Sequence, residues 1–230
     1  DHIKVWRTAD VDLVQAREPL NELDSADVVV ICNPNNPDGR RYDPDRLQHA
    51  SAQLAARGGW LIVDEAYADL DPDTSLAPLA GAPGLIILRS TGKFFGLAGL
   101  RLGAVLAPST VNDALEQLLG QWRLSGIALA LGSAAYVDSD WQQATRARLS
   151  DARARLDEIV LRSGVRIAGG TDLFRLLELP DAHSTWARLC QHGIYTRRFD
   201  WSKTLLRIGL PPTPADEARV ATALLLEGQG

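Results

Sequence analysis

The chain contains no methionine among its 230 residues, and it begins with Asp1-His2-Ile3. Because a complete translation product starts with methionine, we expect the native protein to have further residues before Asp1. Any fold or site that needs residues from that part would then be incomplete in this chain.

Cysteine is also scarce, with Cys32 and Cys190 far apart in the sequence. Cys32 lies in an apolar run, where a free cysteine commonly behaves as a small buried hydrophobe. Two such cysteines argue against a disulfide framework and favour a reducing cytoplasm.

Several other features are missing. No apolar run approaches the ~20 residues that crossing a bilayer requires, and no charged-then-apolar signal segment opens the chain. The net charge is -5 with both signs intermixed, so there is no basic stripe for nucleic acid. The four histidines show no paired spacing such as HExxH, so we expect no metal site. The remaining composition, 46% hydrophobic and 23% charged, is ordinary for a globular protein.

In the first part of the chain, short apolar runs alternate with amphipathic segments of helix length. Asp43-Pro44 is typical of a helix start, apolar spacing continues to Leu54, and Gly58-Gly59 ends the helix. Strands separated by such segments need crossover connections, so we predict a parallel or mostly parallel sheet. The predicted strands are Val28–Cys32, Trp60–Val63, Leu85–Leu88 and Leu102–Leu106.

After Pro108 the pattern becomes helical, with predicted helices over Val111–Leu119 and from Asp140 to about Leu161. From Gly164 onward, strand-like and helix-like segments alternate, which predicts a small α+β unit. Its predicted strands are Val165–Ile167, Phe174–Leu179, Ile194–Thr196 and Leu205–Ile208, and its helices are Ala182–Gln191 and Pro214–Leu226. We therefore divide the chain into 1–140, part of a large domain, 141–163, a long connecting helix, and 164–230, a small C-terminal domain.

Two polar clusters directly follow predicted strands, at the edge where open α/β sheets bind ligands. Asn33–Gly39 follows the first strand and is equally consistent with a tight polar turn. Asp64 follows the second strand, where it either caps a helix or pairs with a cation in a dry site. Tyr67, three residues on, can point its hydroxyl toward the same place.

A third cluster runs from Ser90 to Gly103 and contains Lys93, between a small-residue turn and an aromatic pair. Lysines usually lie in solvent. Here we expect apolar surroundings and a nearby cation to lower the pKa of Lys93, so that its free amine can react with a carbonyl. Ser90 and Arg101, the latter eight positions beyond the lysine, suit a phosphate.

Together the three clusters resemble the fold-type-I aminotransferases, which carry NPxxG, strand-DExY and SxxK followed by an arginine, in this order. Within that superfamily the chain resembles the histidinol-phosphate aminotransferase branch, and most of all the threonine-phosphate decarboxylases of cobalamin biosynthesis. The segments that carry this likeness are Gly92–Gly103, Gly170–Leu176 and Leu206–Pro211. The resemblance implies an α/β, PLP-dependent transferase-like fold (aspartate aminotransferase, fold type I), with its N-terminal part missing here.

The resemblance also implies pyridoxal 5'-phosphate (PLP) as the cofactor. Lys93 would carry it covalently and later move protons. Asp64 would pair with the pyridinium nitrogen, which keeps the ring electron-accepting. Tyr67 and Asn36 would hydrogen-bond the 3' oxygen of the ring.

The remaining roles implied by the resemblance concern anions. Ser90 and Arg101 would bind the cofactor phosphate. Arg207 would hold one anionic end of the substrate, and Arg197, or Arg198 beside it, would hold a second. A bidentate arginine fork matches a carboxylate or a phosphate.

The chain also departs from the family. Asp38 stands where the family turn often has threonine. The family's glycine-and-serine phosphate cradle, ring-stacking tyrosine and substrate-gating residues precede the region that this chain covers.

The resemblance implies PLP-dependent decarboxylation of O-phospho-L-threonine to aminopropanol phosphate. Transamination of histidinol phosphate or another amino acid would use the same residues and stays open. An inactive fragment with an incomplete cofactor site is a hypothesis of a different class. We expect a small phosphorylated amino acid as substrate, a homodimer, a cytoplasmic location, and neither nucleic acid nor a membrane as partner.

Overall fold

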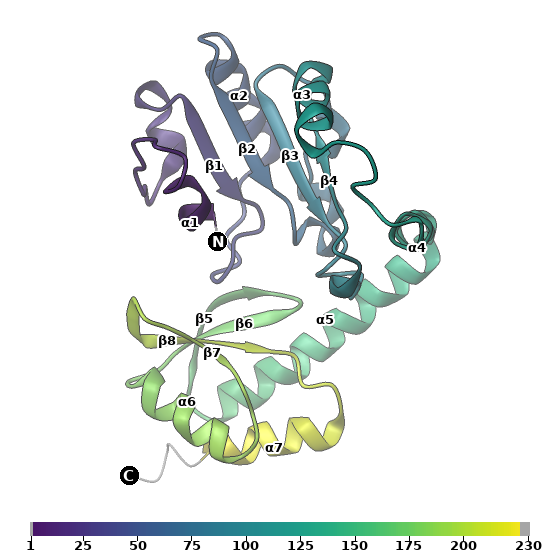
Figure 1. Cartoon of the computed structure of the whole chain (residues 1–230). Coiled ribbons are helices and arrows are strands. Elements are labelled where there is room, and N and C mark those ends of the chain that lie inside the picture. Colours follow the sequence, from purple (N-terminus) through teal and green to yellow (C-terminus); the bar gives the residue numbers. More distant parts are fainter. Residues whose placement is uncertain (1, 226–230) are drawn as a thin grey trace.

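The computed structural model describes residues 2–225, which form two β-sheets connected through a long helix, α5 (Ser139–Arg162). Strands β1–β4 make the first sheet and β5–β8 the second, and α5 runs from one to the other (Figure 1). The predicted α/β architecture with a smaller C-terminal unit is confirmed. The domain limits at residues 140 and 163 stay a prediction, which the separation of the two sheets supports.

The first sheet has the order β1-β2-β3-β4. The first three strands are parallel, as their continuous apolar sequences predict, because strands of that kind are covered on both faces. β4 runs antiparallel to β3, with Ser90 opposite Gly103. The strands are β1 (Val28–Cys32), β2 (Trp60–Asp64), β3 (Leu85–Ser90) and β4 (Gly103–Leu106).

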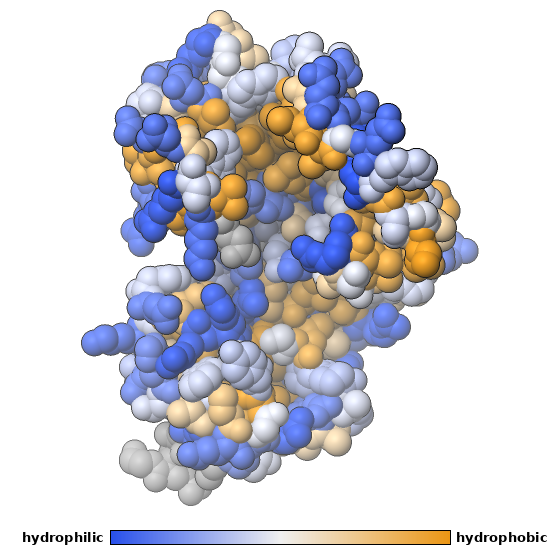
Figure 2. All heavy atoms as spheres, in the orientation of Figure 1, coloured by the Kyte–Doolittle hydropathy of each residue, from blue (hydrophilic) through white to orange (hydrophobic). Residues whose placement is uncertain are grey.

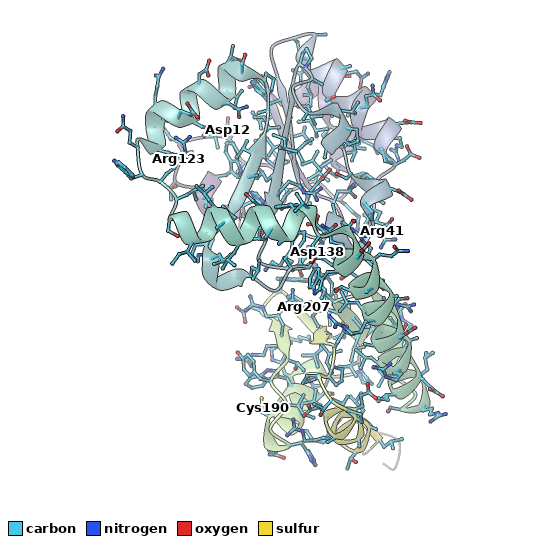
Figure 3. The ribbon with its side chains drawn as sticks, turned by 90° about the vertical axis from the view of Figure 1, so that its right-hand side faces the viewer. Asp12, Arg41, Arg123, Asp138, Cys190 and Arg207 are labelled. Carbon is cyan, nitrogen blue, oxygen red and sulfur yellow. The ribbon has the colours of Figure 1, made fainter. Side chains whose placement is uncertain are left out.

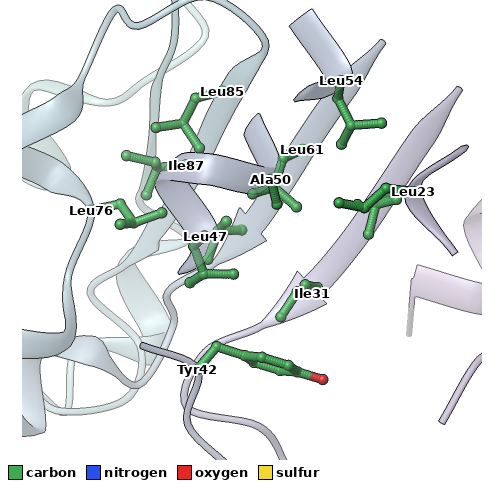
Figure 4. Packing of buried hydrophobic residues seen from close by; sticks show 12 residues of the cluster. Leu23, Ile31, Tyr42, Leu47, Ala50, Leu54, Leu61, Leu76, Leu85 and Ile87 are labelled. Atoms are coloured by element: carbon green, nitrogen blue, oxygen red, sulfur yellow. The ribbon is translucent and has the colours of Figure 1, made fainter. Parts of the chain in front are cut away.

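Helix α2 (Pro44–Ala55) makes the crossover between β1 and β2. The Asp43 side chain caps it by accepting from the amide of Asp45 at 2.8 Å, which satisfies a donor that the first turn leaves unpaired. Its apolar face packs on the sheet, where Leu47, Leu54 and Leu61 are completely buried (Figure 4).

The connection from β2 to β3 contains no α-helix. Three 3-10 turns fill it instead: η3 (Ala68–Leu70), η4 (Pro72–Thr74) and η5 (Ala77–Leu79). Glu65, directly after β2, is completely buried below them. Its carboxylate accepts from Arg89 of β3 at 2.7 Å, from Ser75 Oγ at 2.6 Å and from the Leu76 amide at 2.6 Å. This buried ion pair therefore holds the connection against the sheet.

Two helices follow β4: α3 (Ser109–Leu119), which was predicted, and α4 (Gly126–Val137), which was not. Both leave apolar side chains open to solvent, and Figure 2 shows such residues gathered over α4 at the right of the molecule. These side chains are Leu118 and Leu119 on α3 and Ile127, Leu129 and Val137 on α4, and Trp122 in the connection between the two helices is exposed as well.

The second sheet is antiparallel throughout, with the order β5-β6-β8-β7. Helices α6 and α7, with α5, pack with it around a core that includes Leu177, Leu189 and Leu206. Its elements are β5 (Arg166–Thr171), β6 (Phe174–Glu178), α6 (Ala182–Gln191), β7 (Arg197–Phe199), β8 (Ser202–Gly209) and α7 (Pro214–Leu225).

The strand predicted over Ile194–Thr196 is wrong, because β7 begins only at Arg197. The preceding residues end α6 instead: Gly193 has φ +70°, and the Ile194 amide donates back to the Leu189 carbonyl at 2.8 Å. This is how a helix C-terminus is commonly closed. Leu226, the predicted end of the last helix, lies outside the described residues.

Near the start of the chain, His2–Trp6 forms one short helix, α1, which the sequence pattern did not predict. Among residues 2–225, no helix is both long and apolar enough to cross a membrane.

Candidate active site

A pocket of about 400 Å³ brings together residues of the second sheet and residues of the loops that follow β2 and β3 of the first sheet. Six of the residues that line it matter for its chemistry: Tyr67, Lys93, Phe174, Tyr195, Arg197 and Arg207. Three of the side chains are cationic and two are phenols, so the pocket suits an anionic ligand.

Lys93 reaches this pocket from the loop that follows β3. Thr91, buried, donates from Oγ1 to the Leu102 carbonyl at 2.9 Å, and Phe94 and Phe95 are buried in a cluster with Leu70. The anchored neighbours leave Lys93 exposed, with its Nζ 5.7 Å from the ring centroid of Tyr67. The predicted apolar enclosure of Lys93 is therefore wrong, since the aromatic pair turns into the protein core.

Asp64 lies at the end of β2, and its carboxylate binds an aromatic nitrogen. His2 Nε2 is 2.8 Å from Asp64 Oδ2, and Oδ1 accepts from the Ala66 amide at 3.0 Å. Burial opposes ionisation, yet the bonds from His2 and Ala66 and the charge of Lys93 hold the pKa of Asp64 below its usual range. The same contact, with help from Cys32, raises the pKa of His2 to about 10. Asp64 is therefore an ionised partner for a protonated aromatic nitrogen.

Cys32 lies beside this ion pair, at the end of β1. Ligand atoms of His2, Cys32 and Asp64 all lie within 4.8 Å of one another. Of the described residues, these three form the one group close enough to hold a metal ion, which the histidine spacing did not predict. In this structure the direct contact between His2 and Asp64 holds the group together.

Tyr67 is half-buried and packs edge-on against Phe174 of β6, with ring centroids 5.4 Å apart. Burial raises the pKa of Tyr67, although the nearby Arg207 works in the opposite direction. The phenol therefore stays protonated at neutral pH and is able to donate a hydrogen bond to a ligand oxygen.

Arg207, on β8, reaches from the second sheet to the loop that follows β1. Its Nη1 donates to Asn36 Oδ1 at 2.5 Å, and its guanidinium lies 5.1 Å from the ring centroid of Phe174. Figure 3 shows Arg207 where the small C-terminal unit meets the rest of the molecule. The predicted Asn36 and Arg207 are thus brought together, with the Asn36 amide oxygen already used by the arginine.

The adjacent residues Arg197 and Arg198 differ in their surroundings. Arg197 lines the pocket and pairs with Arg207 in the β7–β8 register. Arg198 lies outside the pocket wall, with its guanidinium 4.5 Å from the ring centroid of Trp186. Successive residues of a strand face opposite sides, which accounts for the difference.

Ser90 and Arg101 flank the lysine loop but do not line the pocket. Ser90 Oγ accepts from the Gly92 amide at 3.1 Å. Arg101 is exposed, has φ +52°, and donates weakly to the Ala98 carbonyl at 3.4 Å. Their role toward a phosphate stays a prediction.

Three residues of the site were not predicted from the sequence. Phe174 falls inside the segment Gly170–Leu176, and Tyr195 is two residues before Arg197 and so on the same face of an extended chain, which means that the sequence does carry a signal for both. The sequence around His2 carries no such signal, because only the fold brings His2 to Asp64, which is 62 positions away.

The sequence matches the family described as aminotransferase class I and II over residues 2–224. The chain belongs to this family. The resemblance to the aminotransferases and the fold predicted from it are therefore confirmed.

Individual relatives are similar over much of the chain. It is 43% identical to a threonine-phosphate decarboxylase from Pseudomonas aeruginosa, over 98% of this chain and 68% of that protein. It is 33% identical to a histidinol-phosphate aminotransferase from Streptomyces avermitilis, over 81% of this chain and 51% of the relative. The crystal structure of a histidinol-phosphate aminotransferase from Sinorhizobium meliloti in complex with pyridoxal-5'-phosphate superposes with a TM-score of 0.81 at 25% identity, over 94% of this chain and 63% of that one. The chain thus spans about half to two thirds of the length of these proteins.

Proposed function

We propose that this chain is the lysine-bearing part of a PLP-dependent enzyme that decarboxylates O-phospho-L-threonine. The observation that carries the proposal is the pocket in which Lys93, Tyr67, Arg197 and Arg207 meet. The 43% identity to a threonine-phosphate decarboxylase supports this substrate over others.

The residues present fit the cofactor. Asp64 already binds a protonated aromatic nitrogen, and the His2 ring stands in for the pyridinium N–H that PLP presents. Tyr67 keeps its proton, as a donor to the ring oxygen must. Lys93 lies within reach of the same pocket and is exposed, so an incoming aldehyde has access to it. PLP can reach Asp64 only when His2 leaves that carboxylate.

When bound, PLP supplies a ring that accepts the electron pair left as the carbon–carboxylate bond breaks. The residues of the chain supply orientation and proton transfer. Asp64, ionised, keeps a positive ring nitrogen in place, and Tyr67 donates to the ring oxygen. Lys93 Nζ is the group we assign to returning a proton to the carbon from which carbon dioxide has left, which balances the reaction.

Two cationic side chains would fix the orientation of the substrate, and this orientation determines which of its bonds breaks. O-Phospho-L-threonine has a carboxylate at one end and a phosphate at the other, and Arg207 and Arg197 present two guanidinium groups in one pocket. We assign the carboxylate to Arg207 and the phosphate to Arg197. Ser90 and Arg101 remain our candidates for the cofactor phosphate.

A transaminase of the histidinol-phosphate type is the second candidate, favoured by the similarity to such an enzyme at 33% identity. It would hold its substrate with the same residues but orient it so that a carbon–hydrogen bond breaks in place of the bond to a carboxylate. Release of carbon dioxide without a keto acid separates the two activities.

We further propose a homodimer in the cytoplasm. The exposed apolar side chains on α3 and α4 support an association surface, and the two free cysteines support a reducing compartment. Sedimentation of the purified protein tests the dimer directly.

The experiment for the main proposal uses the protein saturated with PLP and supplied with O-phospho-L-threonine. We expect carbon dioxide and aminopropanol phosphate in equal amounts, with no keto acid present. Product that forms only when a keto acid is added would support the transaminase, and no reaction under either condition would support an inactive fragment.

A further inference from the structure

The loop that follows β1 touches β5 of the second sheet backbone to backbone. The Gly170 amide donates to the Asp38 carbonyl at 2.8 Å. This hydrogen bond joins residues 132 positions apart, so it docks one sheet on the other.

Glycine is required at this contact for reasons of space. A Cβ on Gly169 would lie 2.1 Å from the Asp38 carbonyl oxygen, and one on Gly39 would lie 1.9 Å from the Gly170 carbonyl oxygen. Ordinary contacts of a Cβ begin at 3.4 Å, so a side chain at Gly169 would push the two backbones apart by about 1 Å or more. Gly39 also has φ +71°, but Gly169 lies outside the left-handed region, and its need for glycine is steric alone.

Strand β5, which makes this contact, is connected through paired residues of the sheet to the two arginines of the pocket, Arg207 and Arg197. Gly169 of β5 pairs with Leu176 of β6, Leu176 pairs with Arg207 of β8, and Arg207 pairs with Arg197 of β7. A hydrogen-bonded row of this kind moves as a unit, because each strand is tied to the next at a fixed spacing. The other side of the contact belongs to the loop that carries Asn36, the residue that accepts from Arg207.

We propose that Gly39, Gly169 and Gly170 are positioning residues, and that their close backbone contact sets how far Arg207 and Arg197 stand from the cofactor side of the pocket. The inference rests on the proposed function for the identity of the ligand, but not for the contact itself. A displacement of about 1 Å at the row would reach both guanidinium groups, and because these groups hold the substrate, a misplacement of that size should lower kcat/KM mainly through weaker binding.

The test compares Gly169→Ala with Gly126→Ala. Gly126 is exposed at the start of α4 and lies outside the left-handed region, and a Cβ there would meet nothing within 4 Å, so it controls for the change of residue alone. Amide hydrogen exchange of Gly170, followed by NMR, reports the docking hydrogen bond. The Leu61 amide, which donates to the Gly84 carbonyl at 2.8 Å in the first sheet and away from this contact, serves as the internal reference.

In Gly169→Ala we expect the protection of the Gly170 amide to fall at least about tenfold, and the KM for O-phospho-L-threonine to rise about tenfold with a smaller change in kcat. Affinity for inorganic phosphate, measured by calorimetry, should fall in parallel. Gly126→Ala should change none of these. If Gly169→Ala does not fold, Gly39→Ala probes the same contact from the other side.

Unchanged Gly170 exchange would overturn the docking role, and lost protection with unchanged phosphate affinity would overturn the link to the arginines. If the parent protein does not turn over O-phospho-L-threonine, the proposed function fails. The exchange and phosphate measurements then still decide the positioning role.

Discussion

The two neighbouring arginines of β7 provide the sharpest test of substrate recognition. Arg197 lines the pocket, whereas Arg198 packs on Trp186 outside it. Replacing each with alanine removes the same charge from adjacent positions of one strand. We expect only Arg197→Ala to change how the protein treats a phosphorylated substrate.

The magnitude follows from the surroundings of Arg197. A hydrogen bond to a charged group is worth about 1.5–3 kcal/mol when buried. Because Arg197 is exposed, we expect solvent to reduce this to about 1–2 kcal/mol, or roughly 5- to 30-fold in kcat/KM. The loss of Arg198 removes a stacked cation worth about 0.5–1 kcal/mol of stability and should leave the kinetics unchanged.

The assay measures carbon dioxide release from O-phospho-L-threonine and from L-threonine with each variant. Arg197→Ala should lose efficiency with the phosphorylated substrate and little with L-threonine, which lacks the second anion. An equal loss with both substrates, or the same loss in Arg198→Ala, would refute the assignment of the phosphate to Arg197.

Three further predictions concern the lysine, the ion pair at Asp64 and the buried acid. Lys93→Ala should abolish the absorbance of covalently bound cofactor at roughly 400–430 nm together with activity, whereas Lys203→Ala, at an exposed position of β8, should retain both. Turnover by a PLP-loaded Lys93→Ala variant would exclude the lysine from the chemistry. His2→Ala should tighten PLP binding, because the carboxylate it occupies becomes free, and should lower the free energy of unfolding by about 1 kcal/mol. The pKa of His2 is raised from 6.5 to about 10, so the stability difference between the parent protein and His2→Ala should be complete below pH 6.5 and vanish as the pH rises through about 10. A difference that grows with pH would contradict this role of His2. Glu65→Ala should cost about 1–3 kcal/mol in urea unfolding, because buried donors of Ser75 and Leu76 lose their acceptor while Arg89 keeps its ion pair with Asp69. Glu65→Gln, which keeps a hydrogen-bonding carbonyl oxygen, should cost less, and equal values would show that the charge alone matters.

Local sequence determined most of the secondary structure. The local sequence is sufficient to predict the strand Val28–Cys32 and the helix that Asp43 caps. A β-branched run and a helix cap are both recognised from residues only a few positions apart. The order of the asparagine, aspartate–tyrosine and lysine clusters was likewise sufficient to identify the family. Ile194–Thr196 was misassigned as a strand because an apolar pair can end a helix as well as begin a strand.

The tertiary structure alone decided which of these residues face one another. The pairing of His2 with Asp64 and the exposure of Lys93 depend on the placement of segments distant in sequence. Strand alternation alone separates Arg197 from Arg198, but the fold decides which of the two faces the pocket. The spacing of the two sheets is set in the same way. No local pattern distinguishes a glycine required by a turn from one required by a backbone 131 residues away, because that steric demand exists only once the two segments have met.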